Sequence, residues 1–377
     1  MVSAGERTLR LYRSWVGRTL DEVETPVPVV DLDLLDANVA RLQDYANAHG
    51  IAVWPHAKTH KSIEVGSRQL AAGATGLTVA KSGEAEVFHE AGVERLLLHY
   101  PTYGAAKWER LARLVADGLD LTIALDDATA AEGLSGALVA GGGHADVLIE
   151  VDVGMRRTGV ASAADAVSLA RRVDALPGLD VVGISGYPGM RATGRSLSPY
   201  LDGVDATLRA TRDAFQNAGL ACERISAGST PTRYLTHTTC ISEIRPGTYV
   251  FLDRTEAPTE PDGGLDACAL TILATVISTR VTQRAIVDAG SKSVTSDPHP
   301  DGGHGVVVGV GGTLVALNEE HGYIDLEPAT TSPQIGQRVR IIPNHACTCV
   351  NLHDALLGVR SGRVESVIPV AARGLTW

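Results

Sequence analysis

The sequence lacks long apolar runs and any excess of positive charge, and each absence excludes a class of protein. Its longest uncharged apolar stretch, from about Gly305 to Asn318, is too short and too rich in glycine for the ~18 residues of a membrane span. The formal net charge of −11 argues against a nucleic-acid partner. Met1 to Glu24 carries alternating charges and no continuous apolar segment, so we expect no signal peptide.

Cysteine is also scarce. The chain has five cysteines, and an odd number speaks against a disulfide framework. Together these absences favour a reduced, soluble, cytoplasmic protein without a membrane or nucleic-acid partner. No Gly-x-Gly-x-x-Gly follows the first apolar run, which weakens a dinucleotide-binding interpretation.

What the chain does have is length and a repeating pattern, because 377 residues with 44% hydrophobic content suffice for two domains. From Val27 to about Asp253, short apolar runs alternate with segments of helical period, which is typical of parallel strands with crossover helices. Eight or nine such units favour a closed (β/α)8 barrel rather than an open doubly wound sheet, and we expect this barrel to span residues 25–254. The expected strands are Val27–Val30, Ile51–Trp54, Gly76–Ala80, Arg95–His99, Leu121–Leu125, Val147–Val153, Val181–Ser185, Arg224–Ala227 and Tyr249–Leu252.

Beyond Asp253 the pattern changes. Thr255 to Leu265 is rich in proline, glycine and acidic residues and is typical of a crossing loop. Alternating β-branched stretches follow, broken by glycines, so residues 255–377 are expected to form a separate β domain. Residues 1–24 precede the barrel, and we expect them to pack on one of the two domains, with the β domain favoured.

The most informative segment is 54–61, which reads Trp-Pro-His-Ala-Lys-Thr-His-Lys and follows an apolar run. Lys58 is thus an amine near neighbouring positive charge at a strand end. Desolvation and nearby cations both disfavour the ammonium form and so leave an amine able to form a Schiff base. A solvated basic loop is the alternative for any single lysine, and only agreement with other motifs argues against it.

Three further loops follow expected strands, where a parallel barrel places its active site. They contribute a guanidinium (Arg157), a phenol (Tyr187) and a Gly/Ser/Thr turn (Ser226–Thr232) that leads toward a possible helix and offers N–H groups and hydroxyls to a phosphate. Such a turn is a weak signal by itself. An amine, a phosphate site and polar ring partners together are what pyridoxal phosphate requires.

A second group of residues lies at Pro343–Asn351, directly after the strand-like Val339–Ile342. On an extended chain His345, Cys347 and Cys349 would share a face, and imidazole and thiolate are zinc ligands. The alternative is a reduced cysteine pair in the core of the β domain with a histidine at the surface. The spacing alone leaves both interpretations open.

Several segments, in this order, resemble the metal-dependent D-serine dehydratase and D-threonine aldolase family, from about Thr25 to Arg373. The family has an alanine-racemase-type fold, in which a pyridoxal-phosphate barrel is joined to a metal-binding β domain. The segments that carry the resemblance are Pro-His-Ala-Lys-Thr-His-Lys (55–61), Asp-Val-Gly-Met-Arg-Arg-Thr-Gly (152–159), Gly-Ser-Thr-Pro-Thr (228–232), Glu-Ile-Arg-Pro-Gly-Thr-Tyr-Val-Phe-Leu-Asp (243–253), Val-Asp-Ala-Gly (287–290), Glu-Glu-His-Gly (319–322) and Pro-Asn-His-Ala-Cys (343–347).

The resemblance implies roles for individual residues. It makes Lys58 the catalytic Schiff-base lysine, places Tyr187 at the pyridine nitrogen and Arg157 near the phenolic oxygen, and assigns His345 and Cys347 to the metal. The cofactor-binding residues that it implies are His56, Lys58, Arg157, Tyr187, Gly228, Ser229, Thr230 and Tyr249. The chain departs from the family at Trp54, where members usually have Arg, and Cys349 is no part of the family's metal pair.

The resemblance also implies a reaction on a small β-hydroxy D-amino acid. Dehydratases of the family resemble His-x-Cys with zinc, whereas the aldolases more often show His-x-Asp, which suits manganese or another harder divalent metal. His345-Ala-Cys347 therefore favours zinc-assisted β-elimination, as in D-serine dehydratase. The alternatives are retro-aldol cleavage to glycine and an aldehyde, a 3-hydroxyaspartate dehydratase or aldolase, a racemase and a non-enzymatic pyridoxal-phosphate carrier. A homodimer is expected by fold analogy alone.

Overall fold

The computed structural model describes residues 3–189, 197–261, 264–327 and 332–377. Contacts divide the chain into two compact units, and each draws on separate stretches of sequence. The barrel unit consists of Ala40–Lys58, Gly66–Gly247 and Gly374–Trp377. The β unit consists of Met1–Val39, Thr59–Val65 and Thr248–Arg373.

The barrel unit is built on an eight-stranded parallel sheet with the order β2-β9-β8-β7-β6-β5-β4-β3. A bridge between His56 and Thr78 joins the two ends of this order, so the strands form a closed ring. The predicted (β/α)8 architecture is confirmed. The strands are β2 (Ala52–Val53), β3 (Leu77–Val79), β4 (Arg95–Leu98), β5 (Asp120–Leu125), β6 (Ala145–Glu150), β7 (Leu179–Ser185), β8 (Arg224–Ser226) and β9 (Glu243–Ile244).

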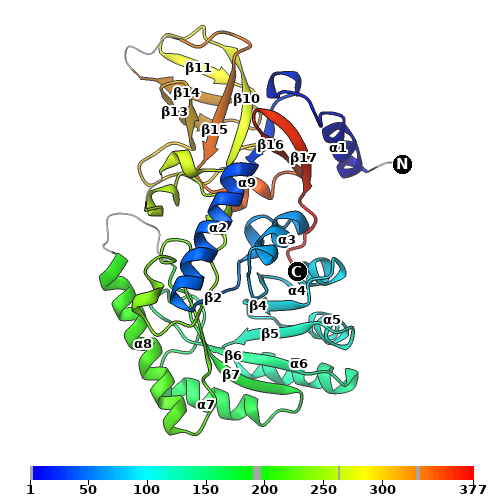
Figure 1. Cartoon of the computed structure of the whole chain (residues 1–377), viewed down its shortest axis with the longest axis vertical. Coiled ribbons are helices and arrows are strands. Elements are labelled where there is room, and N and C mark those ends of the chain that lie inside the picture. Colours follow the sequence, from blue (N-terminus) through cyan, green and yellow to red (C-terminus); the bar gives the residue numbers. More distant parts are fainter. Residues whose placement is uncertain (1–2, 190–196, 262–263, 328–331) are drawn as a thin grey trace. The chain divides into compact units, whose positions relative to one another are not determined.

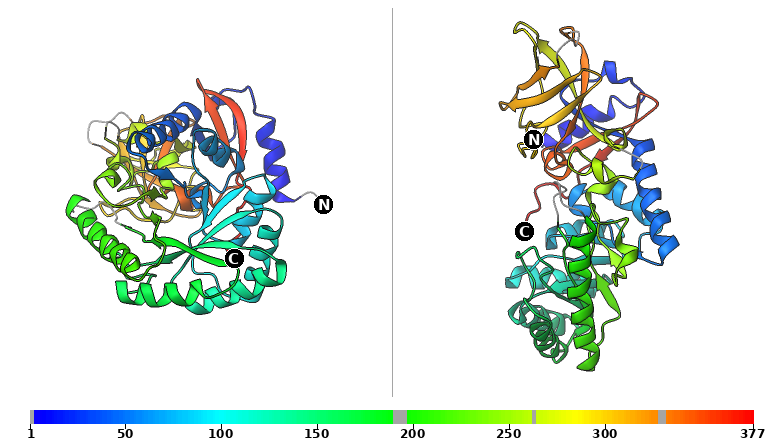
Figure 2. Two further views of the ribbon diagram at one scale, coloured as in Figure 1. Left: turned by 60° about the horizontal axis from the view of Figure 1, so that its bottom comes forward. Right: turned by 90° about the vertical axis from the view of Figure 1, so that its left-hand side faces the viewer.

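Helices alternate with these strands and cover their outer side (Figures 1 and 2), which explains why the strands are nearly continuously buried. Local signals fix the helix ends: Asp127 caps α6 by accepting from Thr129 N, and Gly142 ends it in the left-handed region at φ +69°. Gly183 is needed within β7, because a Cβ there would collide with the backbone oxygen of Arg224. The helices are α2 (Leu32–His49), α3 (Ile63–Ala71), α4 (Ser82–Glu90), α5 (Ala105–Ala116), α6 (Ala128–Gly141), α7 (Ala163–Asp174) and α8 (Leu197–Asn217).

The prediction was wrong for two of the expected barrel strands, which are not part of the barrel sheet. Val27–Val30 does form a strand, β1 (Val27–Asp31), but it pairs with β10 and β16 of the β unit. Tyr249–Leu252 is not a strand, since η4 (Thr248–Val250) is a short 3-10 helix. The ring is completed by β9, whose two residues are too few to show a periodic pattern.

The β unit contains a nine-stranded sheet with the order β11-β14-β13-β12-β15-β10-β1-β16-β17. Strand β10 also pairs with β11, so β10, β11, β14, β13, β12 and β15 close into an antiparallel ring, from which β1, β16 and β17 extend. The strands are β10 (Leu270–Ser278), β11 (Arg284–Val287), β12 (Gly305–Val308), β13 (Gly312–Leu317), β14 (Gly322–Leu326), β15 (Arg338–Pro343), β16 (Ala355–Arg360) and β17 (Arg363–Pro369).

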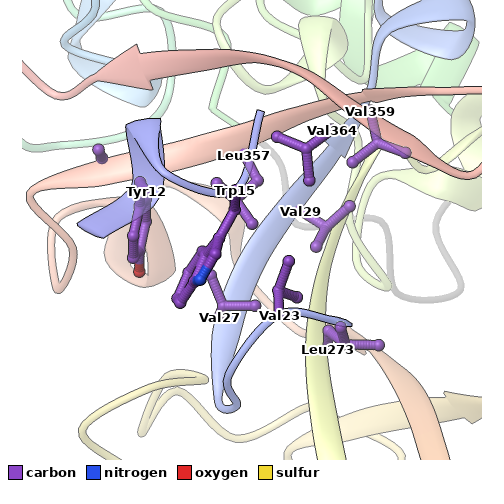
Figure 3. Close-up of a cluster of buried hydrophobic side chains, with 10 residues drawn as sticks. Tyr12, Trp15, Val23, Val27, Val29, Leu273, Leu357, Val359 and Val364 are labelled. Carbon is purple, nitrogen blue, oxygen red and sulfur yellow. The ribbon is translucent and has the colours of Figure 1, made fainter. Parts of the chain in front are cut away.

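Segments near both ends of the sequence contribute to the core of the β unit. Helix α1 (Ala4–Arg13) begins with a Ser3/Glu6 capping box, and Tyr12 at its end packs beside Trp15 on the sheet. Figure 3 shows this cluster, in which residues from β1 meet residues from β10, β16 and β17. Its members are Tyr12, Trp15, Val23, Val27, Val29, Leu273, Ala355, Leu357, Val359 and Val364.

These contacts place residues 25–39 with the β unit, whereas the sequence pattern had assigned them to the barrel. The physical reason is that an apolar strand pattern does not say which sheet the strand joins. Short 3-10 turns connect the remaining segments: η1 (Leu20–Glu22), η2 (Ala57–Thr59), η3 (Thr236–Thr238), η5 (Ala257–Thr259) and η6 (Leu265–Ala267). Among the described residues, no helix combines the length and apolar character that crossing a membrane requires.

Candidate functional site

The first candidate site lies in the barrel unit, at the carboxyl ends of the parallel strands. Lys58 follows β2, Arg157 lies in the loop after β6, and Tyr187 follows β7. The Lys58 Nζ is 5.8 Å from the centroid of the Tyr187 ring, and the Arg157 Cζ is 4.5 Å from the same centroid. The structure therefore brings an amine and a guanidinium to one phenol ring, as expected from residues that follow the carboxyl ends of parallel barrel strands.

The Gly228-Ser229-Thr230 turn follows β8. Gly228 has φ +94°, and a Cβ there would lie 2.8 Å from Ile244 Cγ2, so a larger residue would not fit. Ser229 donates from its hydroxyl to Pro188 O at 2.9 Å and from its backbone N–H to Thr232 Oγ1 at 3.0 Å. The loop is thus buried and held in a fixed shape, although it leads into turns and η3 rather than into an α-helix.

A buried polar cluster at the same strand ends was missed from the sequence. The guanidinium of Arg245, directly after β9, donates to His99 Nε2 at 3.0 Å, to Gly186 O at 2.8 Å and to Ser226 Oγ. Burial, and then the positive charges of Arg245, Lys58 and Arg157, hold the pKa of His99 well below its usual value. His99 is therefore neutral and accepts from Arg245. Burial lowers the pKa of Arg245 to about 10, so it keeps its charge at neutral pH.

Two other predicted cofactor residues have distinct positions. His56 is buried in the barrel unit, and its Nδ1 lies 3.5 Å from the backbone N of Lys58. Tyr249 is buried in η4 of the β unit. The other predicted cofactor residues, from Lys58 to Thr230, all belong to the barrel unit.

These side chains fit pyridoxal phosphate. Lys58 offers an amine to the aldehyde, Thr230 offers a hydroxyl to the phosphate, and Tyr187 and Arg157 offer polar partners to the ring. The hydroxyl of Ser185, the last residue of β7, is buried and has no hydrogen-bond partner in the part of the chain that the structure describes. An orphaned hydroxyl at a strand end indicates that a polar group is missing there.

The second candidate site lies in the β unit, where β15 leads into the short helix α9 (Ala346–Val350). Asn344 is buried and anchors the turn by donating to Asp297 O at 2.9 Å and Gly303 O at 2.8 Å. His345 is the N-cap of α9, and the backbone N–H of Ala346 donates to Asp253 Oδ2 at 2.8 Å. Burial raises the pKa of the Asp253 carboxyl to about 6.

His345 and Cys347 are both supported by neighbours. The Nδ1 of His345 lies 2.6 Å from Asp297 Oδ2. The sulfur of Cys347 lies 3.2 Å from the hydroxyl of Thr59, the residue that follows Lys58 in the sequence, and 3.7 Å from that of Thr248. The hydrogen bond to Cys347, and then Asp297 and Asp253, raise the pKa of His345 to about 10.

Cys349 does not share a face with this pair, so the expectation of an extended segment was wrong. In the helix α9, residues two apart point to different sides. Cys349 is fully buried, and its thiol donates to Ser293 O at 3.6 Å. None of the five cysteines is joined in a disulfide in the described structure.

The pair of His345 and Cys347 fits a zinc-type metal, because imidazole and thiolate are soft donors. Within the described ranges, no group of three or more histidine, cysteine or acidic side chains is arranged to hold a metal ion. Two protein ligands would therefore leave positions open for water or substrate. Thr59, Thr248 and Asp297, which support the pair, were not found from the sequence.

Comparison with known families also gives two parts, but it divides the chain at a single point in the sequence. Residues 30–255 match the model of the alanine racemase N-terminal domain, and residues 269–359 match that of the serine dehydratase domain. The chain belongs to the metal-dependent D-serine dehydratase and D-threonine aldolase family. Bacillus anthracis alanine racemase, at 18% identity over 91% of this chain and 97% of its own, has a TM-score of 0.69 and shows the shared fold alone.

Relatives within this family differ in their reactions. The chain is 35% identical to D-threonine aldolase of an Arthrobacter species, over 96% of this chain and 95% of the relative. It is 33% identical to D-threo-3-hydroxyaspartate dehydratase of a Delftia species, over 87% and 92% of the two chains. D-serine dehydratase of Schizosaccharomyces pombe is more distant, at 25% identity over 89% and 88%. The protein is therefore a lyase of this family, and the nearer relatives favour the aldolases over D-serine dehydratase.

Solved structures of both aldolases and dehydratases of the family resemble this chain. Filomicrobium marinum D-threonine aldolase has a TM-score of 0.89 and 32% identity, over 96% of this chain and 99% of its own. Two variants of a D-threo-3-hydroxyaspartate dehydratase are also similar. One has a TM-score of 0.86 and 29% identity over 94% of this chain and 96% of its own. The other has a TM-score of 0.84 and 30% identity over 93% of this chain and 98% of its own. One has a histidine replaced; the other has the cysteine two positions later replaced and is in the metal-free form.

Proposed function

We propose that this protein is a pyridoxal-phosphate- and metal-dependent lyase that cleaves β-hydroxy D-amino acids between Cα and Cβ, giving glycine and an aldehyde. The observation that carries the proposal is the 35% identity to a D-threonine aldolase over 96% of the chain. The two candidate sites support it, since Lys58, Tyr187 and Arg157 meet at the barrel strand ends and His345 and Cys347 form a soft donor pair.

The chain's residues have separate tasks in this reaction. Gly228, Ser229 and Thr230 would bind the cofactor phosphate, and Lys58 would bind the aldehyde. When bound, pyridoxal phosphate stabilises negative charge at the α carbon, and a divalent metal acts as a Lewis acid toward the β-oxygen. His345 and Cys347 would hold that metal, and Tyr187 would orient the ring between Lys58 and Arg157.

The two lyase reactions use Lys58 in opposite directions. In cleavage of the Cα–Cβ bond the β-hydroxyl must lose its proton to a base as the aldehyde forms, and the α carbon must gain a proton, which Lys58 Nζ would deliver. In elimination of water the α-proton must leave, and the same amine would accept it. The direction of proton movement, rather than the set of residues, then separates the two reactions.

Dehydration to a 2-oxo acid and ammonia is the second candidate, and the His-x-Cys pair favours it. A D-threo-3-hydroxyaspartate dehydratase variant whose structure is in the metal-free form has a cysteine replaced two positions after the histidine that is replaced in another variant. His345 and Cys347 have the same spacing. A 3-hydroxyaspartate substrate is compatible with either reaction, since relatives of both kinds act on it.

Product analysis separates these candidates. Purified protein loaded with pyridoxal phosphate and zinc or manganese is incubated with D-threonine or D-threo-3-hydroxyaspartate, with and without a chelator. We expect chelator-sensitive formation of glycine with acetaldehyde from D-threonine, and none from L-threonine. Formation of 2-oxobutyrate and ammonia instead would replace the aldolase proposal by the dehydratase. Metal-independent racemisation, or binding without turnover, would exclude both lyase reactions.

A further inference from the structure

Asp297 lies in the loop between β11 and β12, away in the sequence from the histidine that it contacts. Its Oδ2 is 2.6 Å from His345 Nδ1, and about 40% of each side chain is exposed. An exposed ion pair with no further support would contribute little. Asp297, however, is also held by other groups, one at its carboxylate and two at its backbone.

These groups lie in the loop that carries Asp297 and in the segment that carries His345. The hydroxyl of Thr348, in α9, donates to the same Asp297 oxygen at 3.2 Å and lies 2.8 Å from the hydroxyl of Thr295. The backbone N–H of Asp297 donates to Thr295 Oγ1 at 3.2 Å, and Asn344 donates to the backbone oxygen of Asp297 at 2.9 Å. The loop and the helix that carries His345 are therefore fixed to each other at the Asp297 carboxylate.

We propose that Asp297 is a positioning residue for the metal site, which accepts the Nδ1–H of His345 and thereby turns Nε2 toward the metal beside Cys347. The inference rests on the proposed function, because it takes His345 and Cys347 as the ligands. A carboxylate on one ring nitrogen fixes the tautomer and the ring orientation of a ligating histidine and raises its basicity. Thr348 and Thr295 in turn fix the carboxylate.

The same geometry argues against Asp297 as a third ligand. Its Oδ2 faces Nδ1, whereas the metal would bind the nitrogen on the other side of the ring. One carboxylate cannot hold Nδ1 and also reach a metal at Nε2. This agrees with the finding that no three such side chains converge within the described ranges.

The experiment measures zinc affinity by competition with a chromophoric chelator, using the full-length pyridoxal-phosphate-loaded protein. Asp297→Asn keeps the size of the side chain and removes its charge, and Asp301→Asn is the matched control in the same loop. We expect zinc affinity to fall about 10- to 100-fold in Asp297→Asn and to stay within about twofold in Asp301→Asn. Excess zinc should restore most of the activity of Asp297→Asn, because the ligands themselves are intact.

A second variant keeps the test informative if Asp297→Asn folds poorly. Thr348→Val removes one donor to the carboxylate, so zinc affinity should fall about threefold to tenfold. Unchanged affinity in both variants, with wild-type zinc binding lost in His345→Ala, would overturn the role of Asp297 and leave the proposed function intact. Zinc binding that does not require His345 would overturn the proposed metal site itself.

Discussion

The two candidate sites differ in how the chain builds them. In the barrel unit, Lys58, Arg157, Tyr187 and Arg245 each come from a different strand end and meet because parallel strands end at one edge. In the β unit, His345 and Cys347 belong to a single turn that enters α9. The first site depends on the closure of a whole ring of strands, whereas the second depends on a few residues and the loop that supports them.

The sites also differ in charge. The barrel site gathers Lys58, Arg157 and Arg245 around a histidine that burial keeps neutral. The site in the β unit gathers the carboxylates of Asp297 and Asp253 around an imidazole beside a thiol. A cationic site suits a phosphate and a carboxylate, and an electron-rich site suits a metal cation. The difference fits the proposed roles of the two sites, with the cofactor in the barrel unit and the metal in the β unit.

Replacing Lys58 should have the largest effect. In Lys58→Ala the amine that would bind the aldehyde and carry the α-proton is gone, so turnover should fall on the order of 10⁴-fold. Borohydride reduction followed by mass spectrometry of peptides should find the cofactor fixed to Lys58 in the wild type. Lys81→Ala is the control, since Lys81 also follows a strand end but stacks 3.6 Å over the Tyr100 ring. A cofactor adduct that persists in Lys58→Ala would contradict the assignment.

Replacing the two cysteines of α9 should separate a ligand from a core residue. Cys347→Ala removes a proposed metal ligand, so bound zinc should be lost and turnover should fall about 10²- to 10³-fold. Cys349→Ala removes a fully buried thiol, so zinc should remain while the free energy of unfolding falls by about 1 kcal/mol. Measurement of bound zinc and urea unfolding of each variant test these two expectations. Equal loss of zinc in the two variants would contradict the inference that Cys347 is a ligand and Cys349 a core residue.

The pH dependence of stability should report the neutral histidine of the barrel site. Because the pKa of His99 lies well below 6.5 in the folded state, only the unfolded chain takes up that proton as the pH falls from about 7 to 5. As the pH falls, the free energy of unfolding of the wild type should therefore decrease by up to about 1.4 kcal/mol per pH unit more than that of His99→Gln. Urea unfolding at several pH values measures this difference. Parallel curves for the two proteins would mean that His99 takes up its proton over the same pH range in the folded and the unfolded chain.

The smallest effect should come from the two hydroxyls at the Cys347 sulfur. Thr59→Val removes the contact at 3.2 Å, and Thr248→Val removes the longer one at 3.7 Å. A hydrogen bond contributes about 1 kcal/mol, so zinc affinity should fall about fivefold in the first variant and less in the second. Zinc titration of both proteins tests the order. The reverse order would mean that Thr248 is the main support of the sulfur.

Much of the barrel and part of each site could be predicted from the sequence. Seven of the apolar runs became barrel strands because strands buried on both faces are apolar throughout. His345 and Cys347 were found because both lie in one segment. The roles of Asp297 and Arg245 could not be found in this way, since Asp297 and His345 are 48 residues apart and Arg245 meets His99 across the barrel.

The errors have equally physical causes. The segment around Cys349 follows a strand, and five helical residues are too few to show a helical period. The apolar Tyr249–Leu252 is buried through a 3-10 turn rather than by strand pairing. Strand β1 has the composition of a barrel strand, but its partners Leu273 and Leu357 were invisible without tertiary contacts.

The pairing of β1 with β10 and β16 also has a consequence for how the protein is made. Val29 leaves the ribosome well before its partners Thr271 and Leu357, which lie 242 and 328 residues further along the chain. At 5–20 residues per second, roughly 300 intervening residues take on the order of 15–60 s. During that interval β1 is an unpaired apolar segment on a nascent chain. The proposed metal site, which depends on this sheet, can therefore mature only after the residues around Leu357 have been translated.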